Sequence, residues 1–92
     1  MDCSEVKFSG HAVQRMFERD IPKAAIMAII NNGEIIQHYP SGVSVLILGF
    51  AGNRPLHVVV ARLPEGGTCL VVTTYVPDPQ IWSDDYRSRR TP

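Results

Sequence analysis

The sequence predicts an α+β fold in which two N-terminal helices pack on one face of a roughly four-stranded antiparallel sheet. Apolar residues recur at helical spacing up to Asn32, and from Glu34 onward the period changes to two and β-branched residues dominate. The connectors between the expected strands are short and rich in turn residues, which favours antiparallel hairpins over crossover connections. With 92 residues, 45% of them hydrophobic, the chain is expected to form a single domain, 1–92, with a small core.

The first expected helix begins near Ser9, a good N-cap residue, and ends before Pro22, because a residue that precedes proline is pushed out of the α region. At about 100° per residue, one side of this helix carries the polar residues His11, Arg15, Glu18 and Arg19, and the other carries the apolar residues Ala12, Val13, Met16 and Phe17. We expect the apolar side to pack on the sheet through Val13, Met16 and Phe17. His11 and Arg15 would then face a groove beside the third and fourth strands.

The remaining elements follow in order along the chain. A second helix is expected over residues 22–32, with a buried stripe of Ala25, Ile26, Ile29 and Ile30 and a stop at Asn32-Gly33. Four strands are expected at 35–39, 44–50, 56–62 and 69–75. The prolines after Tyr75 end the ladder and begin a C-terminal arm, about 76–92. Within it, residues 82–90 are expected to form a short helix or an extended segment over the domain, anchored by Trp82 and Tyr86.

Composition narrows the class of protein. Nine Lys and Arg balance nine Asp and Glu, so nucleic-acid binding would need a local patch, and the clearest basic cluster is Arg87, Arg89 and Arg90. Cys3 and Cys69 are far apart and lack metal-ligand spacing, so neither a disulfide framework nor a zinc site is expected, and a reducing, cytoplasmic location fits best. No apolar run approaches the ~20 residues of a membrane span, and no signal-peptide region is expected.

A second group of polar residues comes from the last hairpin. If its turn centres on Glu65-Gly66, paired positions sum to 131, so His57 opposes Thr74 with a margin of one residue, and Tyr75 is adjacent on the other face. His57 lies in an apolar run where an unpaired imidazole is costly. It is therefore either a core histidine held by a carbonyl or by Thr74, or a proton-transfer group.

Four segments are together typical of one family. They are Phe8-Ser9-x-His11-Ala12-x-x-Arg15-Met16-x-Glu18-Arg19-x-Ile21, Gly33-Glu34-Ile35-Ile36, Arg54-Pro55-Leu56-His57-Val58-Val59 and Thr73-Thr74-Tyr75-x-Pro77-Asp78-Pro79-x-x-Trp82. Over nearly the whole chain this set resembles the domain-of-unknown-function 4258 family, which is similar to RelE/ParE-like toxins of bacterial toxin–antitoxin pairs and to barnase-like ribonucleases. The resemblance implies a RelE/barnase-like topology. It also implies a site made of His11, Arg15, Arg19, His57 and Thr74 or Tyr75.

These residue types suit metal-independent RNA cleavage, in which a base takes the ribose 2′-OH proton, an acid protonates the leaving oxygen and cations stabilise the phosphorane. His57 and His11 would share the acid and base roles in an order left open, Arg15 and Arg19 would clamp the phosphate, and Thr74 or Tyr75 would orient it. We therefore expect the toxin of a type II pair, with RNA as substrate, a small antitoxin as partner and the three C-terminal arginines as RNA contacts. No cofactor or metal is expected, because Asp78, Asp84 and Asp85 form no ligand constellation.

The alternative is a non-enzymatic protein-interaction domain. A partner peptide would bind at the exposed sheet edge and the C-terminal arm. The His/Arg side of the first helix would be a solvated face held by Glu18, or would pair with acidic residues of the partner. No Gly-rich phosphate loop or cofactor motif supports a small-molecule-binding domain. Distance separates the first two hypotheses, because His11, Arg15 and His57 should converge on one cleft in an enzyme and lie apart in an interaction domain.

Overall fold

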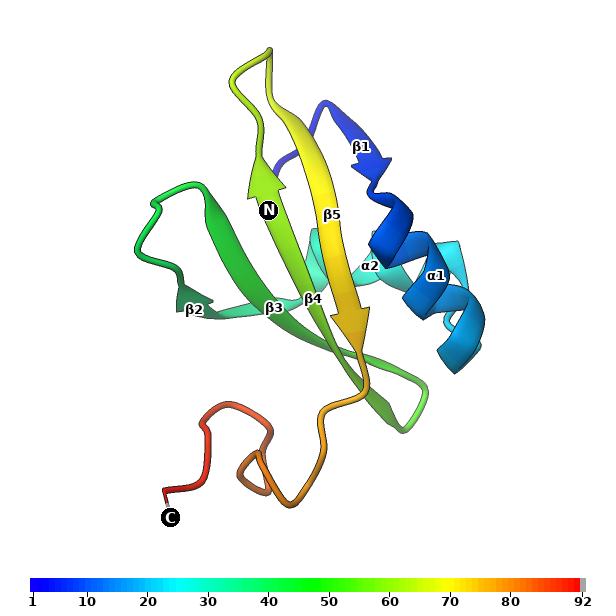
Figure 1. Ribbon diagram of the computed structural model, residues 1–92, viewed down its shortest axis with the longest axis vertical. Coiled ribbons are helices and arrows are strands. Elements are labelled where there is room, and N and C mark those ends of the chain that lie inside the picture. The colour runs from blue at the N-terminus through cyan, green and yellow to red at the C-terminus, as the bar shows by residue number, and fades with distance from the viewer. Residues whose placement is uncertain (92) are drawn as a thin grey trace.

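A computed structural model describes residues 1–91 and contains five strands and two helices (Figure 1). In chain order the elements are β1 (Glu5–Phe8), α1 (Gly10–Arg19), α2 (Lys23–Asn32), β2 (Glu34–His38), β3 (Ser44–Ala51), β4 (Arg54–Arg62) and β5 (Thr68–Tyr75). All strands belong to one sheet with the order β1-β5-β4-β3-β2. Strand β1 runs parallel to β5, whereas the other three pairs are antiparallel.

The first strand overturns the predicted fold. The chain begins with β1 rather than with a helix, and the sheet is mixed and five-stranded. The prediction of two N-terminal helices on a four-stranded antiparallel sheet, with RelE/barnase-like topology, is therefore wrong. The segment Glu5–Phe8 is only four residues long and alternates exposed and half-buried positions. Its partner is more than 60 residues away in sequence, at Thr68 to Val71. The local hydrophobic pattern does not predict so short an edge strand, because the strand forms only by pairing with the distant β5.

Helix α1 has the predicted start but a different orientation. Ser9 caps it by accepting a hydrogen bond from the Ala12 N–H at 3.0 Å. The helix packs on β5 with Ala12 fully buried and Met16 partly buried, whereas Val13 is 54% exposed and Phe17 is 89% exposed. The prediction that Val13 and Phe17 pack on the sheet is therefore wrong. The small Ala12 side chain lets the helix backbone approach the strand, and this fixes the rotation.

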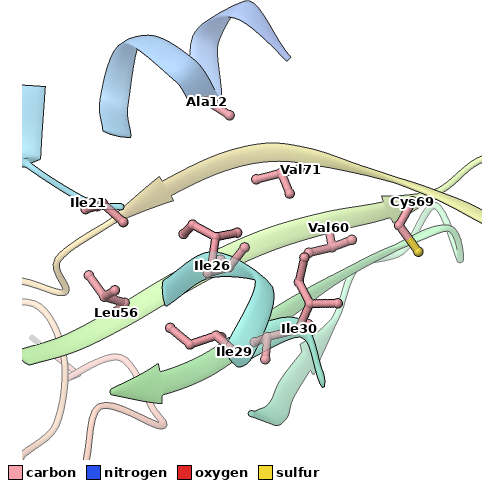
Figure 2. Close-up of a cluster of buried hydrophobic side chains, with 11 residues drawn as sticks. Ala12, Ile21, Ile26, Ile29, Ile30, Leu56, Val60, Cys69 and Val71 are labelled. Atoms are coloured by element: carbon pink, nitrogen blue, oxygen red, sulfur yellow. The ribbon is translucent and has the colours of Figure 1, made fainter. Parts of the chain in front are cut away.

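The main core lies between the helices and one face of the sheet (Figure 2). Helix α2 contributes Ile26, Ile29 and Ile30, as predicted, and packs on β3 and β4. The sheet contributes Ile47, Leu56, Val58, Val60, Cys69 and Val71. A Cβ atom added at Gly49 would stand 2.4 Å from the Ile29 side chain, so the close approach of α2 to β3 requires glycine at this position.

The opposite face of the sheet has its own smaller core beneath the C-terminal arm, residues 76–91. Side chains alternate along a strand, so His57 points away from the face that carries Leu56 and Val58. Cross-strand pairing aligns four residues across the sheet: Glu34, Leu48, His57 and Tyr75. The arm lies over this row, and its Trp82 is buried there, as predicted for an anchor.

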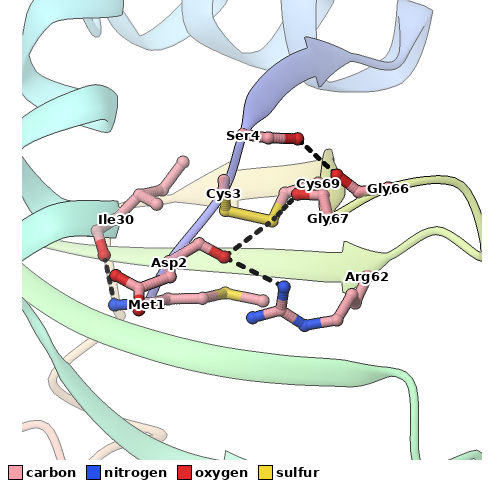
Figure 3. Close-up of a disulfide and its surroundings, with 9 residues drawn as sticks. All are labelled: Met1, Asp2, Cys3, Ser4, Ile30, Arg62, Gly66, Gly67 and Cys69. Carbon is pink, nitrogen blue, oxygen red and sulfur yellow. Dashed lines mark hydrogen bonds between the residues drawn. A yellow bond between two sulfur atoms is a disulfide. The ribbon is translucent and has the colours of Figure 1, made fainter.

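A disulfide joins Cys3 to Cys69 and ties the N-terminal segment to the start of β5 (Figure 3). The Arg62 guanidinium donates to the Asp2 carbonyl at 2.9 Å, and the Ser4 hydroxyl donates to the Gly66 carbonyl at 2.6 Å, next to this bond. The expectation of no disulfide is wrong, because cysteines that are 66 positions apart meet only through the β1–β5 pairing. The cysteine argument for a reducing compartment therefore does not hold. In the described part of the chain, neither helix has the length and apolar character needed to cross a bilayer.

Candidate functional site

The His57 ring is enclosed between β4 and the arm. It is fully buried, its Nδ1 lies 3.2 Å from the Tyr75 hydroxyl, and its Nε2 lies 2.9 Å from the Tyr86 carbonyl oxygen. The Trp82 ring meets it edge to face, with 4.4 Å between the ring centroids. Both ring nitrogens are thus occupied, and the side chains of the arm separate the ring from solvent.

The partners of His57 determine its tautomer. A carbonyl oxygen only accepts, so Nε2 carries the proton and donates to Tyr86, and Nδ1 accepts from the Tyr75 hydroxyl. Burial lowers the pKa of His57, and the hydrogen bond to the Tyr86 carbonyl offsets part of this effect. Burial raises the pKa of Tyr75, with a further increase from Tyr39 and an opposing effect of Arg89. At neutral pH this is a pair of uncharged groups.

Thr74 supports the same region from the other face of the sheet. Its side chain is buried, and its hydroxyl donates to the His57 carbonyl oxygen at 2.9 Å. The predicted register, with positions summing to 131, is correct next to the turn, where Val60 pairs with Val71. A bulge between Val59 and Val60 adds one residue on β5, so His57 pairs with Tyr75. Tyr75, rather than Thr74, therefore shares a face with His57.

The polar residues of α1 lie apart from His57. His11 and Arg19 are exposed, and the Arg15 guanidinium donates to the Glu18 carboxylate at 2.9 Å. No hydrogen bond or ion pair within residues 1–91 joins them to His57. Ala12, the inward residue of α1, packs in the cluster of Leu56 and Val58, on the face opposite to His57. The single cleft expected for an enzyme is not formed, and the face of α1 matches a solvated surface held by Glu18.

The three C-terminal arginines are engaged within the chain. Arg87 makes a two-pronged contact with the Glu34 carboxylate at 2.8 and 3.0 Å, and this hydrogen bond lowers the pKa of Glu34. Arg89 lies over the Trp82 ring, 5.3 Å from its centroid. Arg90 pairs with Asp84 at 2.8 Å. Each arginine of the expected RNA-binding cluster therefore already contacts an acidic or aromatic side chain of the same chain.

A groove opens where α2 ends and β2 begins, beside residues 48–50 of β3. Its volume is about 460 Å³, and it is lined by Ala28, Ile29, Asn32, Gly33, Glu34, Leu48, Gly49, Phe50 and Arg87. The floor is mainly apolar, and the Glu34–Arg87 pair forms its polar rim. Sequence reasoning missed this feature. The available signal was Gly49, because a glycine inside a strand often marks close backbone approach.

Comparison with known proteins places the chain in a family. The model for a domain of unknown function, DUF4258, matches residues 8–76. The chain belongs to the DUF4258 family. No curated protein and no solved structure matches it. His57 and Tyr75 of this DUF4258 domain lie inside the matched region, whereas Trp82 and Tyr86, which close over His57, follow it. Within residues 1–91, no three His, Cys, Asp or Glu side chains form a group that could hold a metal ion.

Proposed function

We propose that this DUF4258 domain is a non-enzymatic protein-interaction domain that holds an extended segment of a partner protein along the free edge of β2. One observation carries this proposal: a groove of about 460 Å³ with apolar residues in its floor begins at Glu34, the first residue of the edge strand β2. An extended peptide can add a strand to such an edge and place a side chain in an adjoining pocket. Phe50, 55% exposed in the groove wall, supplies an apolar contact for that side chain.

The burial of His57 supports a binding role over a catalytic one. A general acid or base needs to come within hydrogen-bond reach of the substrate proton, and both His57 nitrogens are already bonded beneath Trp82. The RNA phosphate would also have to meet Arg15 and Arg19 on another face of the domain. The toxin ribonuclease expected from the family resemblance thus requires a rearrangement that an interaction domain does not.

The composition of the groove defines the partner segment. Backbone pairing with Glu34–His38 supplies hydrogen bonds that do not depend on the partner sequence. The apolar floor selects one aliphatic or aromatic side chain, and Glu34 is already neutralised by Arg87. We therefore expect the affinity for the peptide to change little with salt concentration, because few contacts between charged groups would contribute to binding.

The test uses peptides selected from a displayed library of random sequences against the full chain. Ala28 is exposed and lines the groove, so Ala28→Arg fills it without disturbing the core, and Ala24→Arg, one turn earlier on the same exposed side of α2, is the matched control. Ala28→Arg should weaken peptide binding at least tenfold, and Ala24→Arg should leave it unchanged. Equal binding by both variants would refute the proposed site. Cleavage of an unstructured RNA by the purified domain would instead establish the ribonuclease.

A further inference from the structure

The C-terminal arm, residues 76–91, is bonded mainly to itself (Figure 1). Within residues 1–91, the backbone hydrogen bonds of the arm stay inside it, as between the Trp82 N–H and the Asp78 carbonyl oxygen at 2.9 Å. An isolated bridge pairs Trp82 with Arg89 and folds the arm back on itself. The arm therefore holds to the sheet through side chains and not through a strand ladder.

Two hydrogen-bonded links join the arm to the sheet in the described part of the chain. The His57 Nε2 donates to the Tyr86 carbonyl oxygen at 2.9 Å, and the Arg87 guanidinium donates to the Glu34 carboxylate at 2.8 Å. About half of each side chain of the Arg87–Glu34 pair is exposed, and such ion pairs contribute little to stability. The His57 link, in contrast, is buried beneath Trp82. It is therefore the more important of the two polar links.

We propose that the arm is an acid-sensitive strap, which protonation of His57 releases from the sheet while the sheet stays folded. The groups that surround this ring from the neighbouring elements are uncharged between pH 5 and 7. They are Leu48 on β3, Tyr75 on β5 with Tyr39 acting on it, and on the arm the Trp82 indole and the Tyr86 carbonyl.

The charged side chains of the arm and of β2 do not compensate a protonated His57. Their carboxylates already have partners within the chain: Glu34 and Asp85 contact Arg87, Asp84 contacts Arg90, and Asp78 accepts from the Gln80 N–H. Arg89, over the Trp82 ring, adds a positive charge to the same region. An imidazolium would thus be buried without a counter-charge, whereas release of the arm lets water reach it. The lowered pKa of His57 agrees with this geometry.

The size of the effect follows from linkage. In the released form the ring regains a pKa of about 6.5, and in the attached form its pKa is lower. The ratio of released to attached arm therefore rises as the pH falls below 6.5, by up to about tenfold between pH 7.5 and 5.5. Release also takes Arg87 away from Glu34 at the groove rim. That consequence rests on the proposed function, whereas the strap itself does not.

Hydrogen exchange of the full chain, followed residue by residue by NMR, tests the strap. The protection factor of the Trp82 backbone amide, corrected for intrinsic exchange at each pH, should fall about three- to tenfold from pH 7.5 to 5.5. At each pH it should also be at least about tenfold below that of the slowest amides of β4 and β5, because the arm opens without the sheet. A Trp82 amide as protected as those amides would overturn the proposal, since the arm would then open only with the whole domain. No peptide is needed, so the result does not depend on binding in the groove.

The three histidines of the chain supply matched variants. His57→Phe keeps a ring beneath Trp82 but cannot titrate, so the Trp82 protection factor should start lower and stay constant between pH 7.5 and 5.5. The double variant His11→Gln with His38→Gln changes two exposed residues and should keep the whole response. A pH-dependent fall that persists in His57→Phe would overturn the proposal. The same holds if the fall is missing from the wild type or from the double variant.

Discussion

Replacing His57 with phenylalanine and with alanine measures how much the arm and the sheet depend on this residue. Phenylalanine keeps a ring between Trp82 and Tyr75 but removes both hydrogen bonds, at about 1 kcal/mol each, so we expect a loss of about 2 kcal/mol. Alanine also leaves a cavity in a fully buried position, which raises the expected loss to about 4 kcal/mol. Urea unfolding monitored by Trp82 fluorescence gives both values, because the indole contacts the His57 ring.

The pH dependence of stability identifies the neutral histidine. Burial lowers the pKa of His57 in the folded state, so between that value and the unfolded value of about 6.5 the unfolded chain binds the additional proton. The contribution of His57 to stability is therefore complete above pH 6.5 and falls as the pH drops toward the folded pKa. The slope in this window reaches at most about 1.4 kcal/mol per pH unit. His57→Phe should lack this component while keeping the carboxylate titrations at lower pH.

Two results would refute this reasoning. A His57→Ala variant that unfolds within about 0.5 kcal/mol of the wild type would show that the ring does not hold the arm to the sheet. A wild-type stability curve that coincides in shape with that of His57→Phe between pH 5 and 7 would show that the histidine is not buried in the neutral form. Either outcome would indicate that His57 is accessible to solvent, as a general acid or base must be.

Three further perturbations test other parts of the fold. Replacing both Cys3 and Cys69 with serine should lower the free energy of unfolding by up to about 4 kcal/mol, because their 66-residue separation sets the loop-closure entropy. As a control, the reduced wild-type chain should unfold at the same urea concentration as this variant. Asp20→Gly should raise stability by about 1 kcal/mol in thermal melts, because Asp20 caps α1 with φ of 54°, which costs an L side chain energy. Arg87→Ala should change stability by less than about 1 kcal/mol, because its ion pairs are exposed.

The sequence predicted the elements whose signals are local. Both helices and four of the strands appear close to their expected bounds, because caps, prolines and the change of period lie next to the residues that they affect. The strand β1 and the Cys3–Cys69 bond escaped because each depends on a partner more than 60 residues away. The rotation of α1 escaped for another reason. Ala12, Val13, Met16 and Phe17 are all apolar, so the period identified a helix without fixing which side faces the sheet.

The candidate site shows the same division between local and distant information. The anchoring role of Trp82 and the burial of His57 could be predicted, because an aromatic residue in an arm and a histidine in an apolar strand both need partners. The sequence could not predict whether the Thr74 or the Tyr75 hydroxyl faces His57, because the bulge after Val59 shifts the register by one residue. Gly49 signals a close backbone approach in the sequence, but the groove beside it was missed because its shape forms only where α2 meets β3.

The arm offers a final test of whether catalysis lies beneath it. His57 and Tyr75 are inside the DUF4258 match, and Trp82 and the Tyr86 carbonyl close over His57 from outside it. The double variant Trp82→Ala with Tyr86→Ala removes the indole that packs on His57 and the Tyr86 ring that packs on Phe50, and so loosens the arm in the full chain. We expect lower stability and no RNA cleavage, because Arg15 and Arg19 remain on another face of the domain. Cleavage that appears in this variant and disappears when His57→Phe is added would show a ribonuclease held closed by its own arm. Because the peptide groove would keep its apolar floor at Ala28 and Ile29, retained peptide binding without cleavage would favour the interaction domain.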